Sequence, residues 1–245
     1  MRTPAPSATR ANQLSAWGVH LFTASGIVWG VLALLAIIQG RWIPALIWMG
    51  AATMVDASDG TLARRFRVKE VLPGFDGALL DNMVDYFTYV IVPALFLYQG
   101  QLFPPRLALL GVIIITLASA YQFAQADAKT DDNYFKGFPS YWNVVAFYLF
   151  VMALPAWLNF LLVVLLGALV FVPIKYIYHS RTAAFRRLTM FLTLLWGGAV
   201  VALLLSYPQH PTWLVWASFL YVVYYAATSL YLMHRARAYL IKEGH

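Results

Sequence analysis

Long apolar stretches recur along the whole chain, and they are incompatible with an ordinary soluble core. Val19–Ile38, Leu107–Ala126, Leu188–Leu205 and Trp213–Met233 each reach or approach the roughly 20 residues that a helix needs to cross a bilayer. Only 11% of the residues are charged, against about 25% in soluble domains. The chain has no cysteine, which excludes disulfides, thiol nucleophiles and cysteine metal sites. The sequence therefore predicts an all-α, polytopic membrane protein.

Two shorter apolar runs lie beside acidic residues, and their length decides where those residues sit. Trp42–Val55 and Tyr86–Tyr98 are too short to cross the membrane alone. Each becomes long enough only if its helix continues through the neighbouring polar segment, Asp56–Arg64 in the first case and Gly77–Asp85 in the second. We therefore expect the carboxylates to lie inside helices, at one boundary of the membrane.

The uncharged run Tyr141–Ile174 is too long for one crossing and just long enough for two. Its interruption Leu154–Ala156 contains a proline and is the expected turn between two helices. About eight spans then form one transmembrane domain over residues 1–245, with no internal repeat and no soluble domain. The expected spans are 19–38, 43–64, 77–99, 107–126, 140–154, 157–174, 188–205 and 213–233.

The distribution of basic residues supports eight spans and sets their orientation. With the N-terminus inside, Arg41 and Arg106 are the only two of the 17 Lys and Arg residues that fall outside. A single helix over Tyr141–Ile174 would move the basic segment Lys175–Arg187 outside as well. The positive-inside rule therefore favours eight spans with both termini in the cytoplasm. The net charge of +7 is explained by this orientation and by anionic lipid, so no nucleic-acid partner is expected.

The spacing of four aspartates indicates a single metal-binding cavity. Asp56 and Asp59 lie at i and i+3, and Asp81 and Asp85 at i and i+4, so each pair shares one helix face. The short loop between the two helices makes them antiparallel neighbours. Four carboxylates at a membrane boundary need cationic compensation, and ligation by oxygen alone suits Mg²⁺ or Mn²⁺. Two divalent ions would offset four negative charges, as in two-metal sites for displacement at phosphorus. An ion-coupled transporter is the alternative from the geometry alone.

Three more residues beside the aspartates suit a phosphorylated ligand. Gly60 and Gly77 remove side chains where a ligand could approach the backbone closely. Arg64 offers a planar fork for phosphate or carboxylate.

The whole pattern resembles the signature of CDP-alcohol phosphotransferases. That signature is Asp, two residues, Asp-Gly, two residues, Ala-Arg, a spacer, Gly, three residues, Asp, three residues and Asp. Each fixed element is present here, as Asp56, Asp59, Gly60, Ala63, Arg64, Gly77, Asp81 and Asp85. The spacer of twelve is long for the family and leaves the conformation of the loop open.

The resemblance implies a role for each residue of the signature. Asp56, Asp59 and Asp81 would hold metal ions. Asp85 would hold or border them and act as the general base on the attacking hydroxyl. A CDP-linked substrate would bind with CMP as the leaving group, and its CDP portion would contact Asp56, Gly60, Ala63, Arg64 and Gly77.

Beyond the signature, the chain resembles the bacterial phosphatidylcholine synthases of that family over nearly its full length. The residues that carry this likeness are His20–Gly26, Arg67–Pro73, Leu80–Asn82, Asp85–Tyr86, Lys129–Asp131, Phe138–Pro139 and Trp142–Asn143. The resemblance implies the reaction CDP-diacylglycerol + choline → phosphatidylcholine + CMP. It also implies the bacterial cytoplasmic (inner) membrane, with the active site facing the cytoplasm. Sibling enzymes that use serine, inositol or glycerol phosphate are the nearest alternative.

Choline is a quaternary ammonium, which binds aromatic faces and a carboxylate. Tyr86, Tyr134, Trp142 and Asp131 are the candidate choline contacts, although aromatic residues at a membrane boundary also form interfacial belts. None of the five histidines is assigned chemistry. The expected partners are CDP-diacylglycerol, choline and membrane lipids. The sequence does not determine the oligomeric state, and a homodimer is the oligomer considered.

Overall fold

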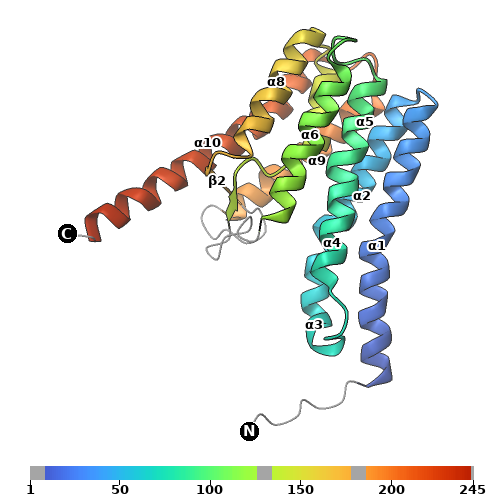
Figure 1. The fold of residues 1–245 in the computed structure, drawn as a ribbon, viewed down its shortest axis with the longest axis vertical. Helices are drawn as coiled ribbons and strands as arrows, with labels where there is room; N and C mark the ends of the chain where they lie inside the picture. Colours follow the sequence, from blue (N-terminus) through green and yellow to red (C-terminus); the bar gives the residue numbers. More distant parts are fainter. Residues whose placement is uncertain (1–8, 126–133, 178–185, 244–245) are drawn as a thin grey trace. The chain divides into compact units, whose positions relative to one another are not determined.

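The computed structural model describes residues 9–125, 134–177 and 186–243, and these residues are mostly helical (Figure 1). The prediction of an all-α membrane protein is therefore confirmed. The chain divides into two compact units, Met1–Val92 and Pro93–His245.

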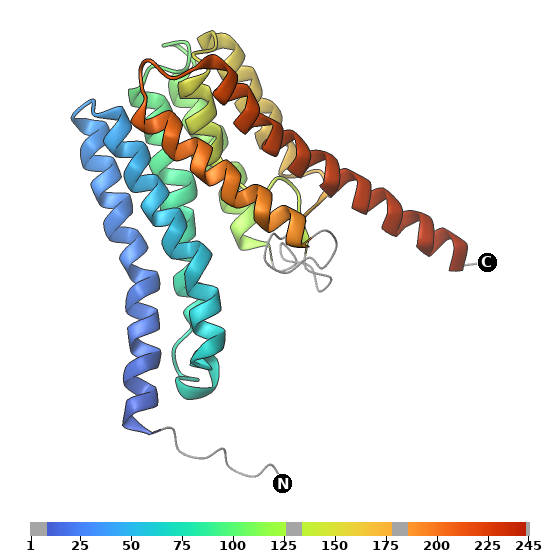
Figure 2. The same ribbon diagram turned by 180° about the vertical axis from the view of Figure 1, so that it is seen from behind.

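The first unit is built on two long helices that lie side by side in both views (Figures 1 and 2). Its elements are α1 (Arg10–Ile38), α2 (Trp42–Arg65), α3 (Val68–Val71), α4 (Gly77–Asp85) and the π-helix η1 (Tyr86–Ile91). Gly40, at a φ of +68°, turns the chain between α1 and α2, and flanking backbone bonds from Gly40 and Arg41 reach back to the last turn of α1. The tight turn makes α1 and α2 antiparallel.

Small residues on α1 allow α4 and η1 to approach it closely. A Cβ atom added to Gly26 would lie 2.6 Å from Cγ1 of Val84, and one added to Gly30 would lie 2.6 Å from Cε1 of Phe87. Both distances are far below ordinary van der Waals contact, so these positions admit no side chain unless the neighbours move. Close backbone packing of this kind is typical of membrane helices.

The segment Gly77–Gln99 forms one continuous helical stretch, from α4 through η1 into α5 (Val92–Gln99). The π-helical turn is closed by an N–H···O bond from Val92 to Phe87, five residues back. The π-helix ends two residues before Pro93. Pro93 has no N–H to donate to the carbonyl of Tyr89 in an α-helical ladder, so a π-turn accommodates the missing donor. The helices that begin at Trp42 and Gly77 both run through their aspartates, as the lengths of the apolar runs predict.

The described residues of the second unit after α5 form five helices and a small β-ladder. They are α6 (Ala108–Ala124), α7 (Trp142–Val151), α8 (Ala156–Leu169), α9 (Arg186–Leu205) and α10 (Thr212–Glu243), with strands β1 (Tyr134–Lys136) and β2 (Lys175–Ile177). The strands pair antiparallel, with Phe135 opposite Tyr176. Sequence analysis did not predict this ladder.

The predicted break between two helices near Pro155 is present, because α7 ends at Val151 and α8 begins at Ala156. Both helices are shorter than the expected spans 140–154 and 157–174. α8 ends at Leu169, whose carbonyl accepts from the N–H of Phe138 at 3.1 Å. Farther along, the carbonyl of Ile174 accepts from the N–H of Gly137 at 2.9 Å.

Within the described part of the chain, four helical stretches are long and apolar enough to cross a membrane, judged by length and composition. They are Arg10–Ile38, Gly77–Gln99, Arg187–Leu205 and Thr212–Leu232. α6, α7 and α8 are apolar but shorter. α2 has the length of a crossing, but its second half carries the aspartates and arginines. Eight crossings and their orientation remain predictions.

Candidate active site

The second half of α2 carries the first two aspartates of the signature. Asp56 is half-buried, whereas Asp59 is only 6% exposed. The helix continues to Arg65, so Arg64 belongs to its last turn, where a cation is favoured by the helix dipole. Nη2 of Arg64 donates to Oγ1 of Thr61 at 3.0 Å. This contact directs the guanidinium back along the helix toward Thr61.

A side-chain cap sets the start of α4 and thereby the register of the other two aspartates. One carboxylate oxygen of Asp76 accepts from the backbone N–H groups of Ala78 and Leu79, each at 3.0 Å. An aspartate cap of this kind typically stabilises a helix by about 1 kcal/mol. With Gly77 fixed as the first helical residue, Asp81 and Asp85 follow one and two turns later.

Three carboxylates from these two helices converge. Asp56, Asp81 and Asp85 are each half-buried, and each offers one oxygen such that the three atoms all lie within 4.8 Å of one another. At an effective dielectric constant of about 20, two full charges at that distance repel by roughly 3 kcal/mol. The cluster therefore favours a bound cation, and its all-oxygen donor set suits Mg²⁺ or Mn²⁺. Convergence of α2 and α4, predicted from spacing, is present in the fold.

A tyrosine from the π-helix completes this arrangement. The hydroxyl of Tyr89 donates to Oδ2 of Asp56 at 2.7 Å, and its side chain is buried. A hydrogen bond from a buried donor orients a carboxylate and leaves its other oxygen for a metal ion. Sequence reasoning did not assign Tyr89 to the site. The available signal is Pro93, which has no N–H to donate to the carbonyl of Tyr89, four residues earlier.

Comparison with known proteins agrees with the geometry of this cluster. Residues 19–174, more than half of the chain, match the family described as CDP-alcohol phosphatidyltransferase. The chain belongs to this family. All the residues of the acidic cluster lie within the matched segment.

Curated relatives narrow the group within the CDP-alcohol phosphatidyltransferases. The chain is 44% identical to the phosphatidylcholine synthase of Pseudomonas aeruginosa over 190 residues, which is 78% of this chain and 80% of that protein. It is 41% identical over 233 residues to the phosphatidylcholine synthase of Legionella pneumophila, covering 92% and 91% of the two chains. The phosphatidylcholine synthase of Borreliella burgdorferi is 36% identical over 229 residues, covering 92% and 97%.

The fourth aspartate of the family signature lies apart from the converging three. Among the described residues, the group that could share a metal ion comprises Asp56, Asp81 and Asp85 and does not include Asp59. Asp59 lies one turn after Asp56 in α2, toward the loop, and is the more deeply buried of the two. Its part in metal binding stays a prediction.

The two signature glycines have different surroundings. A Cβ atom on Gly60 would meet only the Nη1 atom of Arg64, at 3.4 Å, so the space beside this glycine is open apart from a movable side chain. A Cβ atom on Gly77 would lie 2.6 Å from Cε1 of His20. The space at Gly77 is thus filled by a histidine ring from α1. Ala63 packs against the small core of Ala16, Val19 and Val68, which explains a small residue there.

The candidate choline contacts fall in different parts of the chain. Tyr86 follows Asp85 directly, as the first residue of η1, and is half-buried. Trp142 is fully buried in the second unit, where its indole N–H donates to Oγ of Ser119 at 2.7 Å. Tyr134 contributes its backbone to β1, but its side chain and all of Asp131 lie outside the described residues. A choline role for these residues stays a prediction.

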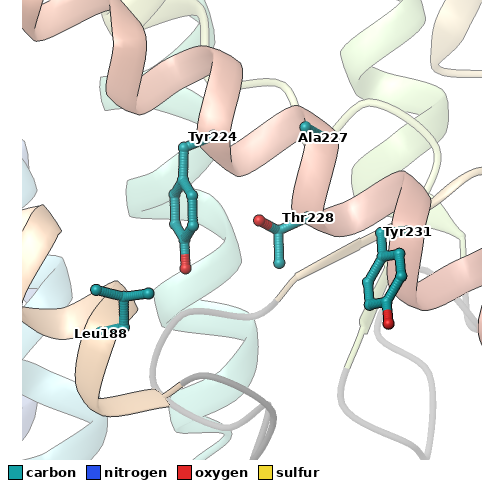
Figure 3. Close-up of a pocket in the computed structure, with 5 residues that line it drawn as sticks. All are labelled: Leu188, Tyr224, Ala227, Thr228 and Tyr231. Carbon is teal, nitrogen blue, oxygen red and sulfur yellow. The ribbon is translucent and has the colours of Figure 1, made fainter.

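The second unit contains an apolar cavity of about 270 Å³ between α9 and α10 (Figure 3). Figure 3 shows side chains of α10 on one side and a leucine of α9 on the other. The lining residues are Leu188, Tyr224, Ala227, Thr228 and Tyr231. Among the described residues that line this cavity there is no carboxylate, so they do not share the chemistry of the acidic cluster.

Proposed function

We propose that this chain is a phosphatidylcholine synthase that joins choline to CDP-diacylglycerol and releases CMP. The observation that carries the proposal is the meeting of Asp56, Asp81 and Asp85 on two antiparallel helices of a CDP-alcohol phosphatidyltransferase. The choice of choline is supported by three relatives named phosphatidylcholine synthase, each aligned over most of both chains.

The proposed reaction is a displacement at the phosphorus attached to diacylglycerol. The choline oxygen forms a new bond to this phosphorus, and the bond from the phosphorus to the bridging oxygen of CMP breaks. Asp85 accepts the hydroxyl proton, and CMP leaves with the electron pair. A divalent ion held by Asp56, Asp81 and Asp85, with Asp59 as a further ligand, would offset negative charge on the diphosphate.

The remaining signature residues bind and orient the nucleotide lipid. The guanidinium of Arg64 lies beside the open backbone of Gly60, where a phosphate can receive its planar fork. The acyl chains stay among the apolar halves of the helices, while the CDP portion faces the loop between α2 and α4. The basic residues around that loop support a cytoplasmic position for it in a bacterial inner membrane.

One experiment tests both the reaction class and the alcohol. Purified protein is supplied with CDP-diacylglycerol, Mn²⁺ and one of choline, serine, inositol or glycerol phosphate, and CMP and lipid products are measured. We expect choline-dependent formation of phosphatidylcholine with equal release of CMP. CMP release with serine but not with choline would assign the chain to a sibling activity. Absence of CMP release with every alcohol would contradict the proposed enzymatic activity.

A further inference from the structure

A cavity of about 280 Å³ lies in the first unit, between the start of α1 and the turn that joins α2 to α3. Figure 1 shows these segments beside one another. α1 supplies two polar side chains to the cavity, and the turn with α3 supplies two guanidinium groups and two apolar side chains. The lining residues are Asn12, Ser15, Arg65, Phe66, Arg67 and Val71. None of them belongs to the family signature or to the acidic cluster, so the proposed reaction gives this cavity no role.

The charge on the walls of this cavity is positive. Arg65 and Arg67 are both exposed, and neither guanidinium forms a hydrogen bond or ion pair with another residue in the described part of the chain. Glu70, the nearest acid in the sequence, is exposed and is not among the lining residues. Asn12 and Ser15 add an amide and a hydroxyl, which can both donate hydrogen bonds. Two cations and two neutral donors around one hollow suit a phosphate group, which accepts hydrogen bonds and is negatively charged.

The backbone of Arg67 provides an independent observation. Its φ of +50° and ψ of +42° lie in the left-handed region, at the position just after the C-cap of α2. Glycine is the usual residue at such a position, because a Cβ atom is disfavoured there. The backbone therefore does not explain an arginine here, and a function of its side chain does. The positive-inside rule explains basic residues in this turn, but not a left-handed arginine that faces polar side chains of α1.

The height of the cavity relative to the membrane indicates the source of the phosphate. The apolar part of α1 begins at Val19, after Asn12 and Ser15. At 1.5 Å per residue, these two residues lie roughly 10 and 6 Å beyond the start of the apolar part. Lipid headgroups extend roughly 5–8 Å beyond the hydrocarbon core on each side. The cavity is therefore level with the headgroups. Phe66, which is 40% exposed, places an apolar ring beside the guanidinium groups, as an amphiphilic ligand requires.

We propose that this cavity binds the phosphate of an anionic phospholipid such as phosphatidylglycerol. Arg65 and Arg67 contact the charged phosphate, the polar side chains of α1 donate to its oxygens, and Phe66 packs against the glycerol backbone of the lipid. The bound phosphate thereby joins the start of α1 to the turn after α2. The inference goes beyond the proposed function, because this lipid is neither a substrate nor the product of that reaction.

Native mass spectrometry of the full chain in detergent tests the inference in the absence of CDP lipid and choline. The protein is titrated with phosphatidylglycerol, with zwitterionic phosphatidylcholine and with inorganic phosphate. One phosphatidylglycerol should bind more tightly than phosphatidylcholine, and excess inorganic phosphate or CDP should not displace it. Arg65→Gln should weaken this binding about 5-fold or more, the effect of one basic residue beside an anionic lipid. Lys69→Gln is the matched control, because Lys69 is exposed in the same segment but does not line the cavity, and the affinity should stay close to the wild-type value.

Two further variants keep the test decisive if Arg65→Gln does not fold. Arg67→Gly relieves the left-handed backbone, so its thermal midpoint should equal or exceed that of the wild type while phosphatidylglycerol affinity falls about 5-fold or more. Asn12→Asp places a negative charge in the cavity and should also lower the affinity. Gln13→Glu places the same charge on the neighbouring exposed position of α1, outside the cavity, and should lower the affinity much less.

Four results would overturn the inference. Equal losses in Arg65→Gln and Lys69→Gln would show a diffuse attraction to the whole basic surface, and wild-type affinity in Arg67→Gly would remove that side chain from the site. Displacement of the lipid by inorganic phosphate would show a site for free anions. Displacement by CDP would show that the cavity belongs to the substrate site. Since no alcohol and no turnover are involved, each result is distinct from a failure to make phosphatidylcholine.

Discussion

The close approach of Gly77 and His20 predicts that Gly77→Ala destabilises the protein only while the histidine ring is present. An alanine Cβ at position 77 would lie 2.6 Å from Cε1 of the ring, about 1 Å closer than carbon atoms normally approach. Overpacking of this kind costs about 1–3 kcal/mol. Gly77→Ala should therefore destabilise the protein, although alanine has the better helix propensity.

Removal of the ring should abolish this cost. In a His20→Ala background the space beside position 77 is empty, and Gly77→Ala should be neutral or should stabilise by up to about 1 kcal/mol, the helix-propensity difference. The double-mutant cycle then gives a coupling of at least about 1 kcal/mol, in the range measured for residues in contact. Gly50→Ala is the control, because nothing lies within 4 Å of a Cβ at that position, and it should not destabilise in either background.

Unfolding in detergent can be followed by the fluorescence of the chain's nine tryptophans. The four proteins of the cycle and the Gly50 control are compared in the same detergent and without nucleotide, so that substrate binding does not enter. Equal destabilisation by Gly77→Ala in both backgrounds would refute the contact. If Gly77 is a glycine only to let a ligand approach, Gly77→Ala should not destabilise either the wild-type protein or the His20→Ala variant.

Further predictions concern the acidic cluster and its neighbours. EDTA should abolish CMP release and added Mn²⁺ or Mg²⁺ should restore it, whereas full turnover in chelator would contradict the metal proposal. Asp81→Ala should lose turnover while still purifying as a folded protein. Asp85→Asn should reduce kcat by about 10²–10⁴-fold with a smaller change in CDP-diacylglycerol affinity, and Arg64→Ala should chiefly weaken affinity. Tyr89→Phe should raise the Mn²⁺ concentration for half-maximal activity by about 10-fold, which is the lower end of the effect of residues that orient metal ligands. An unchanged Mn²⁺ concentration for half-maximal activity would show that the hydrogen bond from Tyr89 to Asp56 is not needed for metal binding.

The helices that carry the aspartates could be predicted because the physical constraint on them is simple. The apolar runs before Asp56 and after Asp85 are too short to cross a bilayer, so each helix had to include the neighbouring acids, and both do. Periodicity then placed Asp81 and Asp85 on one face. Periodicity alone did not show that Asp59 would stay outside the closest group, because that depends on how α2 is rotated against α4.

Features that depend on contacts distant in the sequence were not predictable in the same way. The ladder of β1 and β2 joins three-residue strands from two separate loops, too short for an alternating pattern to appear. The fit of His20 against Gly77 depends on the packing of α1, and a lone histidine within an apolar stretch carries no signal of it. These features follow from tertiary packing, which propensity and spacing do not determine.

The π-helix η1 carries Tyr89, the residue that donates a hydrogen bond to Asp56 in the acidic cluster. Pro93 lacks the N–H that would bond to the carbonyl of Tyr89 in a regular helix, and the chain accommodates this with the wider turn of η1 just after Asp85. The wider turn adds a residue per turn, so every side chain after Asp85 is rotated relative to an unbroken α-helix. Tyr89 is thereby directed at Asp56, a residue on a different helix. The π-turn that accommodates this proline therefore also carries the residue that donates a hydrogen bond to a candidate metal ligand.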